Sequence, residues 1–179
     1  MPRIENLPVP GIRPARVQEA AQLSDLCVRS KAVWGYTETF MLLARPALAV
    51  SPEQIDAGDV WVATDAQGNI AGLVALGPGN QPHTLDLDKL FVEPRRTRAG
   101  VGRRLLSHAI AEARRRGARR LTILSDPFAA GFYQRNGATR IGEAPSDAVP
   151  GRMLPLFEID LEPARRLTAV QPSGGAPIC

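Results

Sequence analysis

The chain has 179 residues, of which 44% are hydrophobic and 22% are charged, ordinary values for one globular domain that exclude a fibrous or wholly disordered protein. Its 22 basic residues outnumber its 18 acidic ones and give a net charge of +4. The excess is concentrated between Arg95 and Arg120, where ten arginines and one acid, Glu112, give +9, so this segment is expected to face an anion.

The sequence also argues against a membrane-spanning protein, a secreted protein and a zinc site. No stretch approaches the roughly 18 consecutive apolar residues that a membrane span requires, and the first residues lack the pattern of a signal peptide. Cys27 and Cys179 have no CxxC or histidine spacing typical of zinc and suggest no disulfide framework. We therefore expect a cytoplasmic protein without a metal ion.

The apolar periodicity changes along the chain and predicts alternating strands and helices. Strands are expected over residues 11–17, 59–64, 70–76, 84–92, 119–125, 138–142 and 153–161. Helices are expected over residues 18–33, 39–44, 100–116 and 127–136, and Ser51 followed by Pro52 signals a further helix start. We expect one mixed α/β or α+β domain over residues 11–162, with a flexible arm at 1–10 and a disordered tail at 163–179.

A glycine turn after the strand that ends at Val92 has the features of an anion site. Gly100 and Gly102 open a helix, where the backbone can approach a ligand and free N–H groups point outward with a favourable dipole. A nucleoside triphosphate loop would need GxxxxGK[ST], which does not occur in the chain. A dinucleotide fingerprint would need a third glycine where Leu105 stands.

A second motif, Asp126-Pro127-Phe128-Ala129-Ala130-Gly131-Phe132-Tyr133-Gln134-Arg135-Asn136-Gly137-Ala138, follows downstream. Together with the glycine turn it resembles the GCN5-related N-acetyltransferase (GNAT) family, and the order of elements agrees from Ile12 to about Leu161. The resemblance implies a single GNAT-like α+β domain. Its central mixed, mostly antiparallel sheet would have about six to seven strands, flanked by about four helices.

The resemblance also implies a site for acetyl-CoA. Leu90, Phe91 and Val92 would pair with the pantetheine arm as an additional strand would. The turn that wraps the pyrophosphate would comprise Thr97, Arg98, Ala99, Gly100, Val101, Gly102 and Arg103. Thr97 stands where the family usually has Gln or Arg. Tyr133 is similar to the family tyrosine that serves as general acid toward the sulfur, and Asp126 either contacts the pantetheine or caps the next helix.

The residue that accepts the proton of the attacking amine is left open by the sequence. Asp86 and Asp88 share one strand face by the period of two and are our candidates for the base. Glu38 and His83 are further candidates, whereas His108 is expected on the polar face of its helix. On the acceptor side, Trp34, Tyr36 and Glu38 are the expected substrate-binding residues.

The expected activity is transfer of an acetyl group to a primary amine by direct attack in a ternary complex, with a small-molecule amine as the acceptor. The alternatives are acetylation of a protein N-terminus or lysine, and a non-catalytic acyl-CoA-binding domain. A nucleic-acid-binding module is disfavoured, because residues 95–120 hold no aromatic side chain among the arginines. We expect a monomer or a homodimer.

Overall fold

The computed structural model describes residues 11–96 and 100–162. Three sequence predictions fall outside these residues: the arm at 1–10, the tail at 163–179, and the cofactor contacts of Thr97, Arg98 and Ala99. The remaining predicted elements all lie within the described part of the chain.

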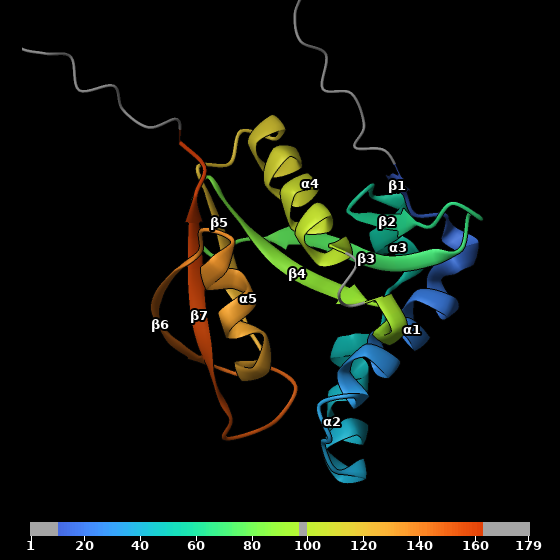
Figure 1. The fold of residues 1–179 in the computed structure, drawn as a ribbon. Helices are drawn as coiled ribbons and strands as arrows, with labels where there is room; N and C mark the ends of the chain where they lie inside the picture. The colour runs from blue at the N-terminus through green and yellow to red at the C-terminus, as the bar shows by residue number, and fades with distance from the viewer. Residues whose placement is uncertain (1–10, 97–99, 163–179) are drawn as a thin grey trace, which may run out of the picture.

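Seven strands form one sheet in the order β1-β2-β3-β4-β5-β7-β6 (Figure 1). They are β1 (Ile12–Pro14), β2 (Val60–Thr64), β3 (Ile70–Pro78), β4 (Thr84–Val92), β5 (Arg120–Leu124), β6 (Thr139–Pro145) and β7 (Met153–Asp160). Neighbouring strands are antiparallel except for β4 and β5, which are parallel. The α4 helix makes the crossover between them, as parallel neighbours require. The predicted α+β fold with six to seven strands is confirmed.

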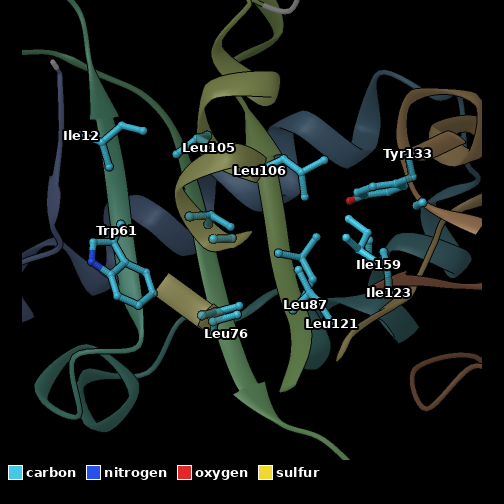
Figure 2. Close-up of a cluster of buried hydrophobic side chains, with 14 of the residues drawn as sticks. Ile12, Trp61, Leu76, Leu87, Leu105, Leu106, Leu121, Ile123, Tyr133 and Ile159 are labelled. Carbon is cyan, nitrogen blue, oxygen red and sulfur yellow. The ribbon is translucent and has the colours of Figure 1, made fainter. Parts of the chain in front are cut away.

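Helices cover both faces of the sheet. They are α1 (Ala20–Ala32), α2 (Glu38–Leu48), the single turn α3 (Pro52–Asp56), α4 (Val101–Arg115) and α5 (Ala130–Arg135). One hydrophobic cluster joins α4 and α5 to one face, and Leu105, Leu106 and Phe157 are fully buried in it. Figure 2 shows Leu105 and Leu106 of α4 facing the sheet. A second cluster joins α1, α2 and α3 to the other face through Leu23 and Leu73. No helix in the described residues is long and apolar enough to cross a membrane.

The predicted capping residues lie at the start of α3. The Ser51 hydroxyl accepts a hydrogen bond from the Gln54 N–H at 3.1 Å, with Pro52 in the first turn of α3. The α2 helix is longer than expected and runs to Leu48, with Pro46 inside its last turn. Burial of Leu48 in the second cluster explains how the apolar face of α2 continues past this proline.

A β-bulge interrupts β4 at Asp88. Ala75 and Leu76 of β3 are consecutive, yet they pair with Lys89 and Leu87, so Asp88 is an extra residue in β4. A bulge bends its strand and breaks the alternation of side chains, so the period of two holds only up to this point. The next side chain, Lys89, is nearly buried, and its ammonium contacts the Asp88 carboxylate at 2.7 Å.

His108 does not lie on an exposed polar face as its spacing suggested. Its imidazole packs edge-on against Trp61 of β2, with ring centroids 5.2 Å apart. Its Nε2 atom is buried and has no hydrogen-bond partner among the described residues. Burial lowers the pKa of His108, because the charged imidazolium is poorly solvated there. The prediction was wrong because helical spacing carries no information about a tryptophan on β2.

The close contact between β3 and α4 gives a test of the fold. A Cβ atom at Gly72 would lie 2.8 Å from the Phe91 carbonyl oxygen and 3.0 Å from Leu105 Cδ1. We expect Gly72→Ala to lower the free energy of unfolding by about 1–3 kcal/mol, since overpacking forces backbone and side chains apart. Denaturant unfolding measures this change.

Gly77→Ala is the matched control on the same strand. Its Cβ would meet only Asp88 Cβ, at an ordinary 3.6 Å. We expect this variant to stay within about 0.5 kcal/mol of the wild-type protein. Equal losses in both variants would contradict the close approach of β3 to α4 at Gly72.

Candidate functional site

The site is organised by the point at which β4 and β5 separate. The two strands pair only over Thr84–Asp86 with Arg120–Thr122. Beyond this pairing, β4 continues to Val92 next to β3, while β5 turns away next to β7 (Figure 1). A wedge therefore opens in the middle of the sheet, bounded by two strands that no longer bond to each other.

The edge of β4 that faces the wedge carries the three residues predicted to bind an extended ligand. Leu90, Phe91 and Val92 pair with β3 on one side, and no strand in the described residues pairs with them on the other. Unpaired backbone N–H and C=O groups inside a protein require another hydrogen-bonding partner. An extended ligand with its own amide groups would fit this edge.

The N-terminus of α4 lies at the open end of the same wedge. Gly100 caps it in the left-handed conformation, with φ of 73°, and no side chain in the described residues caps the first N–H groups. A Cβ at Gly102 would lie 3.4–3.5 Å from Phe132 and Val92, an ordinary van der Waals contact, so packing in this structure does not itself require glycine here. The free amides and the helix dipole suit an anionic ligand such as a phosphate group.

A cavity of about 1040 Å³ runs through the wedge from α4 to α1 and α2. The predicted site residues that line it are Trp34, Asp86, Asp88, Leu90, Phe91, Val92, Gly100, Gly102, Arg103, Asp126 and Tyr133. Three others do not line it. The Val101 side chain is buried in the core, Glu38 is exposed at the start of α2, and Tyr36 contacts cavity-lining residues from behind.

Tyr133 reaches the cavity from α5. Its ring belongs to the α4–α5 hydrophobic cluster and contacts Phe132 edge-on at 5.1 Å. Figure 2 shows the phenol oxygen directed away from α5 toward the centre of that cluster. Burial, and secondarily the charge of Asp126, raises the pKa of Tyr133 well above its usual value. The phenol is therefore protonated at neutral pH.

Two carboxylates flank Thr122 where the strands separate. Asp86 of β4 is opposite Thr122 of β5, and the Thr122 hydroxyl donates a hydrogen bond to the Asp86 carboxylate. Glu158 of β7 is opposite Thr122 on its other side and also lines the cavity. Sequence reasoning missed Glu158, although its position between buried Phe157 and Ile159 marks it as facing the other side of β7.

Asp88 has a different environment from Asp86. Its carboxylate accepts hydrogen bonds from Lys89 Nζ and from Gln54 Nε2 of α3, both at 2.7 Å. It is thus held between a lysine and an amide beside α3.

His83 lies in the turn before β4 with φ of 57°, and its carbonyl accepts a hydrogen bond from the Arg119 N–H at 2.8 Å.

Asp126 joins three distant segments at the end of β5. Its carboxylate contacts Lys31 Nζ of α1 at 2.8 Å, the Tyr36 hydroxyl at 2.8 Å and Arg152 of the β6–β7 loop at 3.5 Å. It also caps the following helical turn by accepting the Phe128 N–H at 3.1 Å, as predicted. Burial alone would raise the pKa of Asp126, but the hydrogen bond and charge of Lys31 outweigh it and lower the pKa.

Two aromatic side chains of the α1–α2 turn stack on rings near Asp126. Trp34 stacks on Phe128 with ring centroids 5.1 Å apart, and Tyr36 stacks on Phe40 at 4.0 Å. Burial and the hydrogen bond to Asp126 raise the pKa of Tyr36 to about 12. Trp34 thus lines the cavity as predicted, whereas Tyr36 contributes its hydroxyl to the Asp126 cluster.

The residues present fit coenzyme A. The free edge of β4 offers backbone groups to an amide-containing arm, and the α4 N-terminus with Arg103 offers N–H groups and charge to phosphates. Tyr133 lines the same cavity as these two regions. In the described residues, no group of three His, Cys, Asp or Glu side chains is arranged to hold a metal ion.

Comparison with solved structures finds the same fold in several acetyltransferases. A GCN5-related N-acetyltransferase from Rhodopseudomonas palustris superposes with a TM-score of 0.68 and 22% identity, covering 85% of this chain and 96% of that one. PaiA N-acetyltransferase from Thermoplasma acidophilum, in complex with coenzyme A, gives a TM-score of 0.65 and 18% identity, over 83% and 97% of the two chains.

A third neighbour is N-acetylglutamate synthase from Neisseria gonorrhoeae, complexed with coenzyme A and N-acetyl-glutamate. It gives a TM-score of 0.61 and 22% identity, covering 85% of this chain and 35% of that one. No curated protein sequence matches this chain. The sequence profile of the Acetyltransferase (GNAT) family matches residues 28–138, a stretch that contains both motifs and most of the cavity. The chain therefore belongs to the GNAT acetyltransferase family, whose members use acetyl-CoA as the co-substrate.

Proposed function

We propose that this protein transfers the acetyl group of acetyl-CoA directly to the primary amine of a small molecule. One observation carries the proposal: a single continuous cavity connects the anion-binding start of α4, Tyr133 and the acceptor end near Lys31 and Arg152. Both substrates can therefore occupy one cavity at once, which lets an amine attack without a covalent enzyme intermediate.

Acetyl-CoA supplies a thioester carbonyl that an amine can attack. The free edge of β4 at Leu90–Val92 would hold its pantetheine arm as an added strand, and Gly100, Gly102 and Arg103 would hold its pyrophosphate. A β4 N–H group near the bulge would stabilise the negative charge that develops on the carbonyl oxygen. The contacts of Thr97, Arg98 and Ala99 stay predictions.

Asp86 is our candidate for the base and Tyr133 for the acid. Asp86 lies at the last position of β4 that pairs with β5 and lines the cavity, whereas Asp88 is already bound by Lys89 and Gln54. As the new N–C bond forms and the C–S bond breaks, Asp86 accepts a proton from the nitrogen and Tyr133 donates one to the sulfur. Solvent then restores both groups, so no oxidant or reductant is required.

A small acceptor is supported by the way in which the far end of the cavity is closed. Arg152 donates a hydrogen bond to the Tyr36 hydroxyl, which donates to Asp126, and Arg152 also forms an ion pair with Asp126 at 3.5 Å. These contacts join the α1–α2 turn to the β6–β7 loop. A protein N-terminus or a lysine on a folded protein would need an open groove at this place. The N-acetyl-glutamate bound by the Neisseria gonorrhoeae synthase is also a small acetylated amine.

Arg103→Ala tests the cofactor site. Removing one charged hydrogen-bond donor to a phosphate costs about 1.5–3 kcal/mol, so we expect the dissociation constant for coenzyme A to rise about 10- to 100-fold. Isothermal titration calorimetry measures the affinity. Arg119→Ala is the matched control: this exposed arginine belongs to the same basic segment but pairs with Glu162 at 3.5 Å at the start of β5. Similar losses of coenzyme A affinity in both variants would argue against a phosphate-binding site at the start of α4.

Tyr133→Phe tests the general acid. The phenyl ring keeps the packing against Phe132, so coenzyme A affinity and thermal stability should stay near wild-type values. The loss of proton donation should lower kcat by about 10²–10⁴-fold, as measured by thiol release from acetyl-CoA. An unchanged kcat would show that Tyr133 acts only in packing.

Asp86→Asn tests the base, with Glu158→Gln as its counterpart across Thr122. We expect kcat/KM to fall at least about 10²-fold at pH 7 in the first variant and less than about 5-fold in the second. The deficit of Asp86→Asn should shrink between pH 7 and 9, because more of the acceptor amine is then already neutral. A larger loss in Glu158→Gln would assign the base to Glu158 instead.

A further inference from the structure

We propose that the acceptor amine carries an anionic oxyacid group, such as a carboxylate or phosphonate, and that Arg152 and Lys31 bind this group. The inference rests on the proposed function and specifies its substrate class. Arg152 and Lys31 come from the β6–β7 loop and from α1, and both line the cavity that holds Tyr133.

Lys31 and Arg152 both contact the Asp126 carboxylate, and all three side chains are largely shielded from solvent. The side chains of Lys31, Arg152 and Asp126 are 13%, 20% and 13% exposed, respectively. Two positive charges on one negative charge leave a local charge of +1 where solvent screens poorly. Asp147, the other acid that lines this end of the cavity, is exposed on the β6–β7 loop and forms no ion pair among the described residues.

The hydrogen-bonding capacity of Arg152 is only partly used. One of its terminal nitrogens donates to the Tyr36 hydroxyl at 2.6 Å and lies 3.5 Å from Asp126. Its other guanidinium nitrogens have no hydrogen-bond partner among the described residues. A guanidinium offers five N–H donors in a planar fork that matches an oxyacid group with two parallel hydrogen bonds. The remaining donors are therefore suited to a second oxyanion.

Aromatic rings hold the guanidinium in place. Arg152 lies 4.8 Å from the centroid of the Phe40 ring and 5.1 Å from that of Tyr36, while Lys31 Nζ lies 5.2 Å from the Tyr36 ring. Since Tyr36 and Phe40 are themselves stacked, both cations rest on one rigid surface. A fixed guanidinium loses little rotamer entropy when it binds a ligand, which favours specific recognition over loose attraction.

The opposite end of the acceptor space carries one carboxylate in excess. Asp86 and Glu158 flank Thr122, and Glu158 pairs with Arg120 at 3.7 Å, which leaves the charge of Asp86. Thr122 lies four residues before Asp126 along β5 and its extension, which is about 13 Å at the rise of an extended strand. Leu156 of β7 and Leu124 of β5 line the cavity between these two charged regions. An amine directed toward Asp86 and an oxyanion held by Arg152 would fit an extended molecule with an apolar linker.

Matched pairs of amines test this inference. Each pair consists of an amino acid and its carboxamide, or an aminoalkylphosphonate and the alkylamine that lacks the phosphonate, over several chain lengths. We expect kcat/KM for at least one anionic member to exceed that of its neutral partner by about 10- to 100-fold, mostly through KM. The carboxylate and phosphonate series distinguish the two oxyacid groups.

Arg152→Gln should reduce the anionic-to-neutral ratio of kcat/KM toward 1, and Arg152→Lys should keep part of it. Because the ratio is measured within one variant, a general loss of folding or activity cancels. Arg140→Gln is the control: this exposed arginine of β6 pairs with Glu143 and should leave the ratio unchanged.

Neutral amines that equal or exceed their anionic partners overturn the inference but leave the proposed acetyl transfer intact. A panel in which no anionic amine is acetylated overturns it as well. Failure of the proposed function has a separate signature, since coenzyme A would then not raise the melting temperature of the wild-type protein.

Discussion

The separation of β4 from β5 is the constraint on which the rest of the molecule depends. Parallel pairing stops after Asp86 and Thr122, β4 carries a bulge two residues further on at Asp88, and β5 continues beside β7. A sheet that opens in its middle exposes backbone groups that ordinarily satisfy each other. In the function we propose, those groups bind the co-substrate, so the interruption in the sheet would also be the binding site.

Two kinds of contact hold the two halves of the sheet together across the wedge. On one face, α4 packs across β3 and β4, and the cluster around Leu106 and Phe157 continues to α5 and β7. At the far end of the wedge, polar contacts at Asp126 connect α1, the α1–α2 turn and the β6–β7 loop. Apolar packing thus holds the half of the cavity that we propose binds the cofactor, and charged contacts shape the half that we propose binds the acceptor.

The basic segment that dominates the charge of the chain divides into parts with different roles. Arg115 and Arg116 both bind Glu112, whose pKa falls to about 2 through the hydrogen bond to Arg115 and then that to Arg116. Arg116 also contacts Asp59 in the turn before β2, and Arg114 donates to the Leu161 carbonyl at 3.1 Å. These arginines attach the end of α4 to the sheet, whereas Arg103 lines the cavity. A net charge alone does not distinguish these two uses.

The sequence by itself determined the elements, their order and the positions of the glycine-turn and tyrosine motifs, because these depend on local periodicity and on residues contiguous in the chain. Gly100, Gly102 and Tyr133 belong to such motifs, and the chain places them where the spacing predicts. Only the tertiary structure decided the acceptor half. Glu158 reaches Thr122 through a strand pairing, and Lys31 meets Arg152 through Asp126 across more than one hundred residues. Contacts between distant segments follow from packing, which no local pattern encodes.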